Sequence, residues 1–245
     1  MPASAVMLPI VTRHDAIPAG EGYELLVDKP KGLTSFGVVR RLRRALGVRK
    51  IRHAGTLDPM ATGLLVVLVG RAATRLQDAF MGLPKVYTGT LRLGETTASY
   101  DAETPVEQRC PADHVTEADL EAVRTRFLGP IEQRPPVYSA VKVGGERLYR
   151  KARRGEDVAV KARTVTIDRL EWTGRRGDDV DFLVHCSKGT YIRSLAHDVG
   201  QALGVGAHLT ALRREAIGPY RVAEAFALDA LTEEKGGEGE RVKGG

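Results

Sequence analysis

One polar, turn-rich segment, residues 53–63, carries the residue types best suited to chemistry. It reads His53-Ala-Gly55-Thr-Leu-Asp58-Pro59-Met-Ala-Thr-Gly63 and runs directly into the apolar stretch Leu64–Val69. That stretch predicts a strand buried on both faces, and a loop held by a rigid strand is a common place for catalytic residues. Asp58 needs no separate base to act as a nucleophile, because an unperturbed aspartate has a pKa of about 3.9. Taken alone, an Asp-Pro pair predicts no more than a turn.

Other familiar signatures of catalytic chemistry are missing from the sequence. It holds no Walker-type phosphate loop, no complete dinucleotide fingerprint and no Gly-x-Ser-x-Gly nucleophile elbow. The 6 histidines lack His-Glu-x-x-His spacing, and the 2 cysteines, Cys110 and Cys186, form no Cys-x-x-Cys pair. We therefore expect chemistry by side chains only, with no cofactor and no metal. The cysteine usage indicates a reducing cytoplasm rather than a disulfide framework.

Length and hydropathy describe a cytoplasmic globular chain. Its 245 residues allow one large domain or two modest ones. No window holds 18 consecutive apolar residues, so no transmembrane helix is predicted. The first residues lack a basic region and include two prolines, which argues against a signal peptide.

Strand and helix patterns surround the polar segment. Residues 23–28 predict a short strand that ends in the turn 29–32. Thr34 or Ser35 can then cap a helix that Gly47 ends. The expected apolar stripe of that helix consists of Phe36, Val39, Leu42 and Leu46.

The second half of the chain continues without a regular βαβ repeat. Strands are predicted over residues 86–93, 164–171 and 180–186, and a helix over residues 116–128 with Asp119 in a capping-box position. Thr190 is expected to cap a last helix, which Gly204 ends. Strands and helices mixed in this way favour the α+β class.

The charge is unevenly distributed. The chain has 37 Lys and Arg against 31 Asp and Glu, a formal net charge of +6. The segment from Arg40 to Arg52 has seven basic residues and no acid, and the segment from Lys142 to Arg163 has eight against three acids. Such clusters suit a polyanionic partner. An ordinary solvated helix face is the alternative for the first of them.

A series of short motifs covers residues 23–220. They are Asp28-Lys29-Pro30-x-Gly32-x-Thr34-Ser35, the segment His53 to Gly63, Lys85-x-Tyr87, Pro135-Pro136-x-Tyr138-Ser-Ala-x-Lys142, Arg147-x-Tyr149, Cys186-Ser-Lys-Gly-Thr-Tyr191-Ile-Arg193, and Gly206-Ala-His208-Leu209 before Leu212-Arg213-Arg214. In these motifs and in their order, the chain resembles the TruB family of tRNA pseudouridine synthases.

The resemblance implies both a fold and a reaction. The implied fold is the α+β pseudouridine synthase catalytic fold, a mixed, mostly antiparallel sheet flanked by helices. The implied reaction isomerises uridine at position 55 in the T loop of tRNA. The base flips out, and the uracil is detached from its ribose and re-attached through C5, without cofactor or metal. Whether the aspartate attacks C6 of the base or C1′ of the sugar is left open.

The resemblance also implies roles for two charged residues. Asp58 becomes the essential catalytic carboxylate. Arg193 becomes the arginine that pairs with it, which we expect to fix its orientation and to lower its pKa by about 1 to 3 units.

Five more residues are implied to contact RNA or to support the site. Tyr87 would pack on the target base, Leu212 against its other side, and Tyr191 would lie beside the pocket. His53 would enter the RNA loop where the base has left. Lys29, with Pro30, would support the active-site loop.

The expected domain plan has three parts. Residues 1–22 form an N-terminal extension, and residues 23–220 form the catalytic domain, in which an insert at 102–129 can contact RNA. Residues 221–245 form a short C-terminal remnant and a flexible tail, with no full RNA-binding domain of the PUA type.

Two other classes of function stay open at this point. One is an RNA-binding or tRNA-folding protein whose isomerase activity is secondary, and the other is an enzyme that acts on free nucleotides. Nothing in the sequence argues for an oligomer, so we expect a monomer with a tRNA T stem-loop as its partner and no membrane association.

Overall fold

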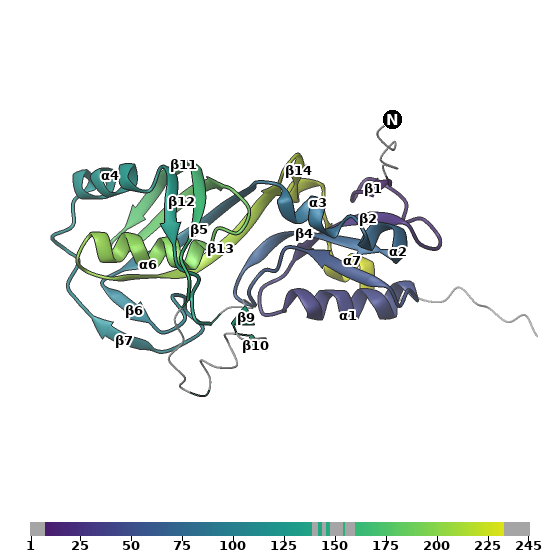
Figure 1. Ribbon diagram of the computed structural model, residues 1–245, viewed down its shortest axis with the longest axis horizontal. Coiled ribbons are helices and arrows are strands. Elements are labelled where there is room, and N and C mark those ends of the chain that lie inside the picture. Colours follow the sequence, from purple (N-terminus) through teal and green to yellow (C-terminus); the bar gives the residue numbers. More distant parts are fainter. Residues whose placement is uncertain (1–7, 139–141, 144–145, 148–153, 155–159, 233–245) are drawn as a thin grey trace, which may run out of the picture.

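The computed structural model describes residues 8–138, 142–143, 146–147, 154 and 160–232 (Figure 1). The elements are, in chain order, β1 (Ile10–Val11), β2 (Tyr23–Lys29), α1 (Ser35–Leu46), β3 (Ile51–Ala54), β4 (Thr62–Val69), α2 (Gly70–Thr74), α3 (Gln77–Gly82), β5 (Lys85–Leu93), β6 (Glu95–Thr97), β7 (Val106–Arg109), α4 (Glu117–Arg126), β8 (Gly129–Gln133), β9 (Lys142–Val143), β10 (Glu146–Arg147), β11 (Arg163–Arg176), β12 (Asp179–Cys186), α6 (Ile192–Ala202), β13 (Ala207–Ile217), β14 (Tyr220–Arg221), the short helix η1 (Val222–Glu224), β15 (Phe226–Ala227) and α7 (Leu228–Thr232).

An 11-stranded mixed sheet runs through the molecule in the order β1-β2-β4-β13-β5-β12-β11-β8, with β3, β14 and β15 attached beside this path. Most neighbours pair antiparallel, and the parallel pairs are β1 with β2, β13 with β4, and β15 with β2. The predicted α+β class with a mixed, mostly antiparallel sheet is therefore confirmed. Because β13 pairs with both β4 and β5, it joins the N-terminal part of the sheet to the rest.

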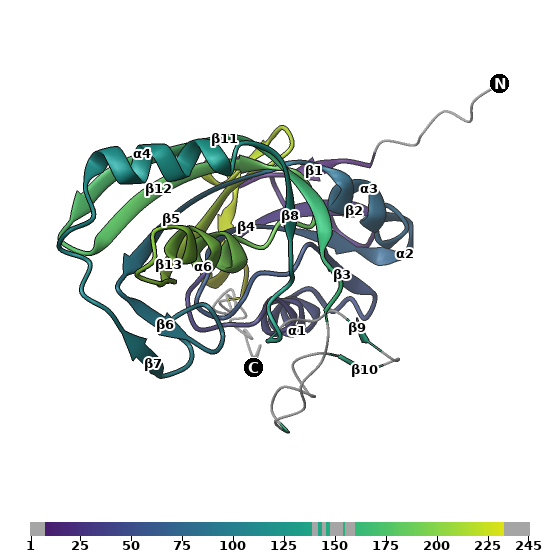
Figure 2. The same ribbon diagram turned by 60° about the vertical axis from the view of Figure 1, so that its left-hand side comes forward.

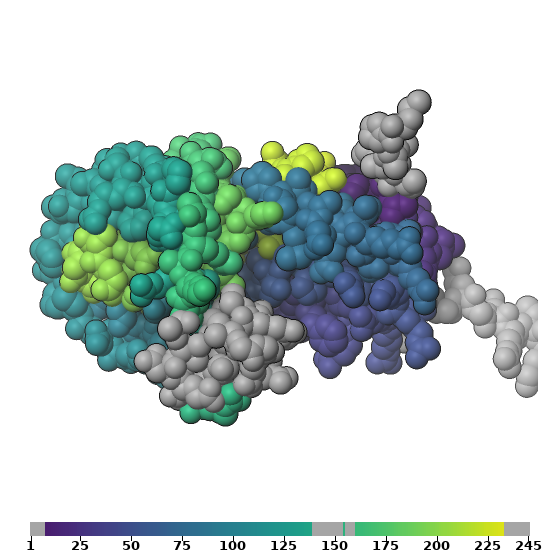
Figure 3. Space-filling view, viewed as in Figure 1, coloured from purple at the N-terminus to yellow at the C-terminus, as the bar shows by residue number. Residues whose placement is uncertain are grey.

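Helices cover the two ends of this sheet. In both ribbon views α1 lies by the N-terminal strands, whereas α4 and α6 lie by β11, β12 and β13 (Figures 1 and 2). In the space-filling view the purple-to-blue N-terminal part and the teal-to-green middle part occupy opposite sides of the molecule (Figure 3). None of the helices in the described ranges is long and apolar enough to cross a membrane.

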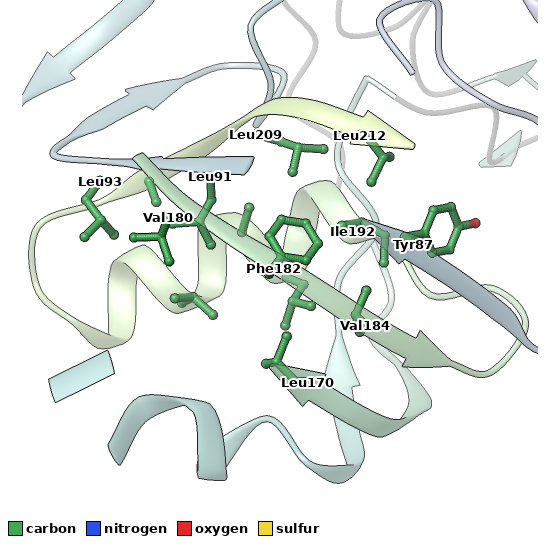
Figure 4. Packing of buried hydrophobic residues seen from close by; sticks show 14 of the residues in the cluster. Tyr87, Leu91, Leu93, Leu170, Val180, Phe182, Val184, Ile192, Leu209 and Leu212 are labelled. Atoms are coloured by element: carbon green, nitrogen blue, oxygen red, sulfur yellow. The ribbon is translucent and has the colours of Figure 1, made fainter. Parts of the chain in front are cut away.

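Three apolar clusters form the core. The largest packs α4 and α6 on β5, β11, β12 and β13, with Phe182 near its centre (Figure 4). The second packs α1 and α7 on β2 and β4, and the third fills the opposite face of β4. Strand β4 contributes to both faces and is buried along almost its whole length, as its continuous apolar run predicts.

Helix α1 begins and ends where the sequence predicts. The Thr34 side chain accepts a hydrogen bond from the Gly37 amide, and Gly47 ends the helix in the left-handed conformation with φ 66°. The apolar stripe differs in one residue, because Val38 is buried and Phe36 is 59% exposed. Arg40, Arg41 and Arg44 are exposed, so one face of the helix is cationic.

Helix α6 corrects a second expectation. It begins at Ile192 with Tyr191 as the N-cap residue, and no side chain caps it. The Thr190 hydroxyl instead donates to the Ser187 carbonyl, which closes the turn between β12 and the helix. This turn places the start of α6, with Arg193 in its first turn, beside the end of β12.

The segment 102–129 contains β7 and α4. Thr116 and Asp119 form the predicted capping box of α4, and Leu120 and Val123 pack in the largest core cluster. At the other end of the chain, residues 220–232 form β14, η1, β15 and α7, of which β15 pairs with β2. Most of the basic segment 142–163 and the predicted tail beyond residue 232 lie outside the described residues.

Candidate active site

A pocket of about 300 Å³ opens where the β3–β4 loop meets β5, β13 and the start of α6. Its size is at the lower end of the range for small-molecule sites. Its lining residues are Gly55, Thr56, Leu57, Asp58, Met81, Lys85, Tyr87, Arg163, Ser187, Gly189, Thr190, Tyr191, Ile192, Arg193, Leu212 and Arg214. Segments far apart in sequence thus meet at one cavity, which includes Asp58, Arg193, Tyr87, Tyr191 and Leu212.

The loop that carries Asp58 is tied down on both sides of the carboxylate. The buried Ser35 hydroxyl accepts a hydrogen bond from the Leu57 amide at 2.8 Å and donates to the Leu57 carbonyl at 3.1 Å. On the other side the Met60 amide donates to Glu103 Oε1 at 2.9 Å. These bonds hold the backbone around Asp58, so its carboxylate has a defined position.

Lys29 also holds the loop that carries Asp58, from the buried side. It is fully buried, and its ammonium group donates to the carbonyls of Pro30 at 2.9 Å, Leu33 at 2.5 Å and Pro59 at 3.4 Å. Burial lowers the pKa of Lys29 to about 8, an effect that Asp58 and Glu103 oppose. Lys29 does not line the pocket and lies behind the loop that carries Asp58.

Arg193 lies against Asp58 and is almost fully buried. Its Nε is 2.9 Å from Asp58 Oδ2. Its Nη1 donates to the Ser99 carbonyl at 2.9 Å and lies 3.4 Å from the buried Asp101 Oδ2, and its Nη2 donates to the Tyr138 carbonyl at 2.9 Å. Nη1 and Nη2 are thus held by hydrogen bonds while Nε faces Asp58 as an ion pair, and these contacts fix the orientation of the arginine.

The pKa of Asp58 corrects the expectation drawn from this pair. Burial raises it above the usual value, and the carboxylate of Asp101 raises it further. Arg193 and Lys29 lower it, as expected, but they do not outweigh the loss of hydration. The side chain keeps 35% of its surface exposed at the pocket. Arg193 therefore limits an upward shift rather than producing a downward one.

Tyr87 and Leu212 form the apolar part of the pocket. They come from the neighbouring strands β5 and β13 and lie with Ile192 at one end of the largest core cluster, where the Tyr87 hydroxyl points away from the core (Figure 4). Burial raises the pKa of Tyr87, whereas the nearby Arg214 lowers it. The phenol is therefore protonated at neutral pH.

Arg214 is a buried cation on the floor of the pocket. It is 1% exposed, and it donates to the carbonyls of Leu64 at 2.7 Å and Gly55 at 3.0 Å. Gly63 makes this position possible. It has φ 99°, and a side chain there would overlap the Arg214 carbonyl oxygen, so only glycine lets β4 approach β13 here.

Tyr191 also lines the pocket, and its backbone is held by Gln133. Its amide donates to Gln133 Oε1 at 2.7 Å, and its carbonyl accepts from Gln133 Nε2 at 3.0 Å. The Arg163 guanidinium lies over the Tyr191 ring, 4.7 Å from its centroid.

His53 lies on β3, outside the residues that line the pocket. It is partly exposed, and burial together with Arg214 lowers its pKa to about 4, so the imidazole is neutral at physiological pH. A neutral imidazole suits an intercalating role better than a phosphate contact.

Three further residues at the site had no role assigned from the sequence: Lys85, Asp101 and Arg214. A fourth, Arg163, was expected only as the last member of the basic segment 142–163. Lys85 and Arg214 belong to motifs that the sequence displays, and that was the available signal. Asp101 and Arg163 reach the site only through the fold. Within the described ranges, no group of three or more His, Cys, Asp or Glu is arranged to hold a metal ion.

Two family models match the chain. That of the TruB family pseudouridylate synthase N-terminal domain matches residues 43–192, and that of the tRNA pseudouridylate synthase B C-terminal domain matches residues 193–240. A protein of Thermobifida fusca called tRNA pseudouridine synthase B is 54% identical over 86% of this chain and 74% of its own. A protein of the same name from Mycobacterium tuberculosis is 49% identical over 85% of this chain and 71% of its own.

Chains in two solved structures are also similar to this chain in sequence and fold. A crystal structure of a Cbf5-Nop10-Gar1 complex contains a chain with a TM-score of 0.62 and 35% identity, covering 81% of this chain and 49% of that one. An H/ACA RNP bound to a substrate RNA containing 2′-deoxyuridine gives a TM-score of 0.64 and 31% identity, covering 85% of this chain and 52% of that one. This chain thus spans about half the length of those two. Together with the family match over most of the sequence, these similarities confirm that the chain belongs to the TruB family of pseudouridylate synthases.

Proposed function

We propose that this isomerase converts uridine to pseudouridine at position 55 in the T loop of tRNA. The observation that carries the proposal is the Asp58–Arg193 ion pair, which lies at a pocket lined by Tyr87 and Leu212. The names of the relatives support tRNA as the substrate. We expect the enzyme to act as a monomer in the cytoplasm.

The reaction needs one nucleophile and one proton transfer. The glycosidic bond between C1′ and N1 breaks, a bond forms between C1′ and C5, the proton on C5 is lost and N1 gains one. Asp58 supplies the ionised carboxylate, attacking either C6 or C1′, and leaves again when the new bond has formed. Arg193 keeps that carboxylate charged and aimed into the pocket.

Tyr87 and Leu212 would hold the uracil between them. Because Tyr87 lines the same pocket as Asp58, we expect it also to relay the C5 proton. Because its phenol is protonated at neutral pH, it acts first as a packing surface and hydrogen-bond donor. Arg214 beside it would stabilise a transient phenolate.

Base flipping sets the energetic requirement. Unstacking a nucleotide costs a few kcal/mol, and a base–aromatic stack returns about 1 to 3 kcal/mol. His53 would fill the gap left in the RNA loop. The exposed arginines of α1, and the basic segment 142–163, would add sequence-independent contacts to phosphates.

Replacing the carboxylate tests the assignment. Wild type, Asp58→Asn and the control Asp178→Asn, at an exposed residue between β11 and β12, are assayed on a T-arm stem-loop RNA. We expect Asp58→Asn to lose pseudouridine formation while it still binds the RNA, and the control to behave as wild type. If Asp58→Asn makes pseudouridine at the wild-type rate, the site assignment is wrong.

Two further measurements separate the other classes of function. Mapping pseudouridine in tRNA from cells with and without the protein should show position 55 unmodified only in its absence. A tRNA-folding protein whose isomerase activity is secondary would keep its role in cells that carry Asp58→Asn, because this variant still binds RNA. An enzyme for free nucleotides would show no steep loss of RNA binding with added salt, in contrast to the dependence expected for a phosphate-binding protein.

A further inference from the structure

The pocket is lined by more cationic side chains than its carboxylates can balance. Arg193 is balanced by Asp58 and Asp101. Lys85 and Arg214 also line the pocket, but their hydrogen bonds go to main-chain carbonyls, those of Met81 and Leu83 for Lys85. Within the part of the chain that is described, no carboxylate lies within ion-pair distance of Lys85, Arg163 or Arg214. The cavity is therefore suited to an anion in addition to a neutral uracil ring.

Arg163 lines the pocket with two donors that are not used. Its Nε and Nη2 are buried and have no hydrogen-bond partner among the described residues. These two nitrogens form one edge of the guanidinium, the edge that binds a carboxylate or phosphate with two parallel hydrogen bonds. Enclosing such an edge without acceptors costs free energy, which points to a ligand rather than to a structural role.

The surroundings of Arg163 are rigid enough to form a binding site. Arg163 is the first residue of β11 and pairs in register with Gln133 of β8. The Gln133 side chain in turn holds the backbone of Tyr191 through two hydrogen bonds, so β8 positions both the guanidinium and the ring on which it stacks. Gly189, with φ 81°, completes the wall, since a Cβ there would lie 3.7 Å from the guanidinium carbon.

From this geometry we propose that Arg163, stacked on Tyr191, forms a phosphate subsite for the phosphodiester that adjoins the target uridine. The proposal rests on the proposed function, because a nucleotide in the pocket brings its own phosphates. Lys85 strengthens the site through its field without contacting the phosphate. Burial and the neighbouring cations Arg214 and Lys188 lower the pKa of Lys85 to about 8, so a nearby phosphate would favour its charged form.

A double-mutant cycle tests the subsite by combining a change in the protein with a change in one linkage of the RNA. The RNA is the T-arm stem-loop with one uncharged methylphosphonate at the linkage 5′ of the target uridine, 3′ of it, or in the distal stem. The proteins are wild type, Arg163→Ala, Arg163→Lys and the control Arg169→Ala, which removes an exposed arginine of the same strand. Dissociation constants and single-turnover rates are measured for each combination.

We expect Arg163→Ala to weaken binding of unmodified RNA about tenfold and to reduce the salt dependence by about one phosphate contact. A methylphosphonate at one of the two linkages next to the target uridine should weaken RNA binding by the wild-type protein by a similar factor. The same methylphosphonate should not change RNA binding by Arg163→Ala. The RNA affinity of Arg163→Lys should lie between those of wild type and Arg163→Ala, because lysine keeps the charge but cannot make two parallel hydrogen bonds. The distal linkage and Arg169→Ala should have no such effect.

The subsite would be overturned if, at both linkages next to the uridine, the loss of affinity from the methylphosphonate simply added to the loss from Arg163→Ala. Unchanged RNA affinity in Arg163→Ala would also overturn it. If wild type still forms pseudouridine in that case, the proposed function stands and only the subsite fails. If Arg163→Ala does not fold, Arg163→Lys gives the same test, since it keeps the charge and loses the edge. A wild-type protein that binds none of these RNAs contradicts both the subsite and the function.

Discussion

Arg193 and Asp58 are joined through a single nitrogen of the guanidinium, with Nε 2.9 Å from Oδ2. The other two nitrogens hold the carbonyls of Ser99 and Tyr138, which lie on different segments. The arginine therefore does two things at once. It favours the charged form of the carboxylate beside it, and it links the two segments that carry Ser99 and Tyr138.

This division of the guanidinium makes lysine a poor substitute. In Arg193→Lys one ammonium group cannot reach all of these acceptors in the same geometry, so buried carbonyls lose their donors. We expect the turnover number to fall by more than tenfold, with a smaller change in RNA affinity. Single-turnover kinetics on the stem-loop RNA measure both, and a near-normal turnover number would remove Arg193 from the mechanism.

The acid side of the pH–rate profile should report the raised pKa of Asp58. In the proposed mechanism Asp58 acts as an ionised carboxylate, so we expect the rate to be lost as pH falls through a value above 3.8. Asp101→Asn removes a neighbouring negative charge that raises this pKa, so its acid limb should move to lower pH. Profiles of kcat between pH 4 and pH 8 for both proteins check this, and an unmoved limb would show that Asp101 does not act on Asp58 electrostatically.

The Ser35 hydroxyl should be needed to position the loop that carries Asp58. Ser35→Ala leaves the amide and carbonyl of Leu57 without their partner in a buried place, which costs about 1 to 3 kcal/mol. We expect a lower midpoint of denaturation and a fall in kcat that exceeds any change in KM. Thr125→Ala, which removes an exposed hydroxyl on α4, is the control. Equal activities of the two variants would contradict the positioning role.

Glu24 should make stability depend on pH. It is 1% exposed on β2, its Oε2 has no partner among the described residues, and burial raises its pKa from 4.5 to about 7. The folded state therefore binds more protons than the unfolded state between these values. The stabilising contribution of the protonated acid is complete below pH 4.5 and is lost as pH rises through 7.

Glu24→Gln should consequently match wild type near pH 5 and be more stable at pH 8. The expected gain is about 3 kcal/mol, because one unit of pKa corresponds to about 1.4 kcal/mol. Urea denaturation at the two pH values measures it, with the exposed Glu21→Gln as control. Tyr220, the titratable side chain whose pKa Glu24 raises, does not ionise in this range. A gain that is equal at both pH values would contradict the assignment.

Local sequence patterns were sufficient for the elements that depend on neighbouring residues. The cap at Thr34, the left-handed Gly47 and the capping box of Thr116 and Asp119 were predicted because each is made within one turn of helix. The continuous apolar run of β4 likewise requires burial on both faces. Phe36 and Thr190 were predicted wrongly, because helical periodicity does not tell which face a neighbouring element covers, and a hydroxyl can turn back to the Ser187 carbonyl instead of capping a helix.

The sequence by itself determined the family, the α+β class and the candidate residues of the site, because motif spacing and local periodicity are properties of the chain. Only the tertiary structure decided how those residues act on one another. The pKa of Asp58 depends on how much water the fold removes. Strand pairings that join distant segments bring Asp101 to Arg193 and Arg163 to the pocket. Hydration and the distances between charges are properties of three-dimensional packing, and no pattern along the chain contains them.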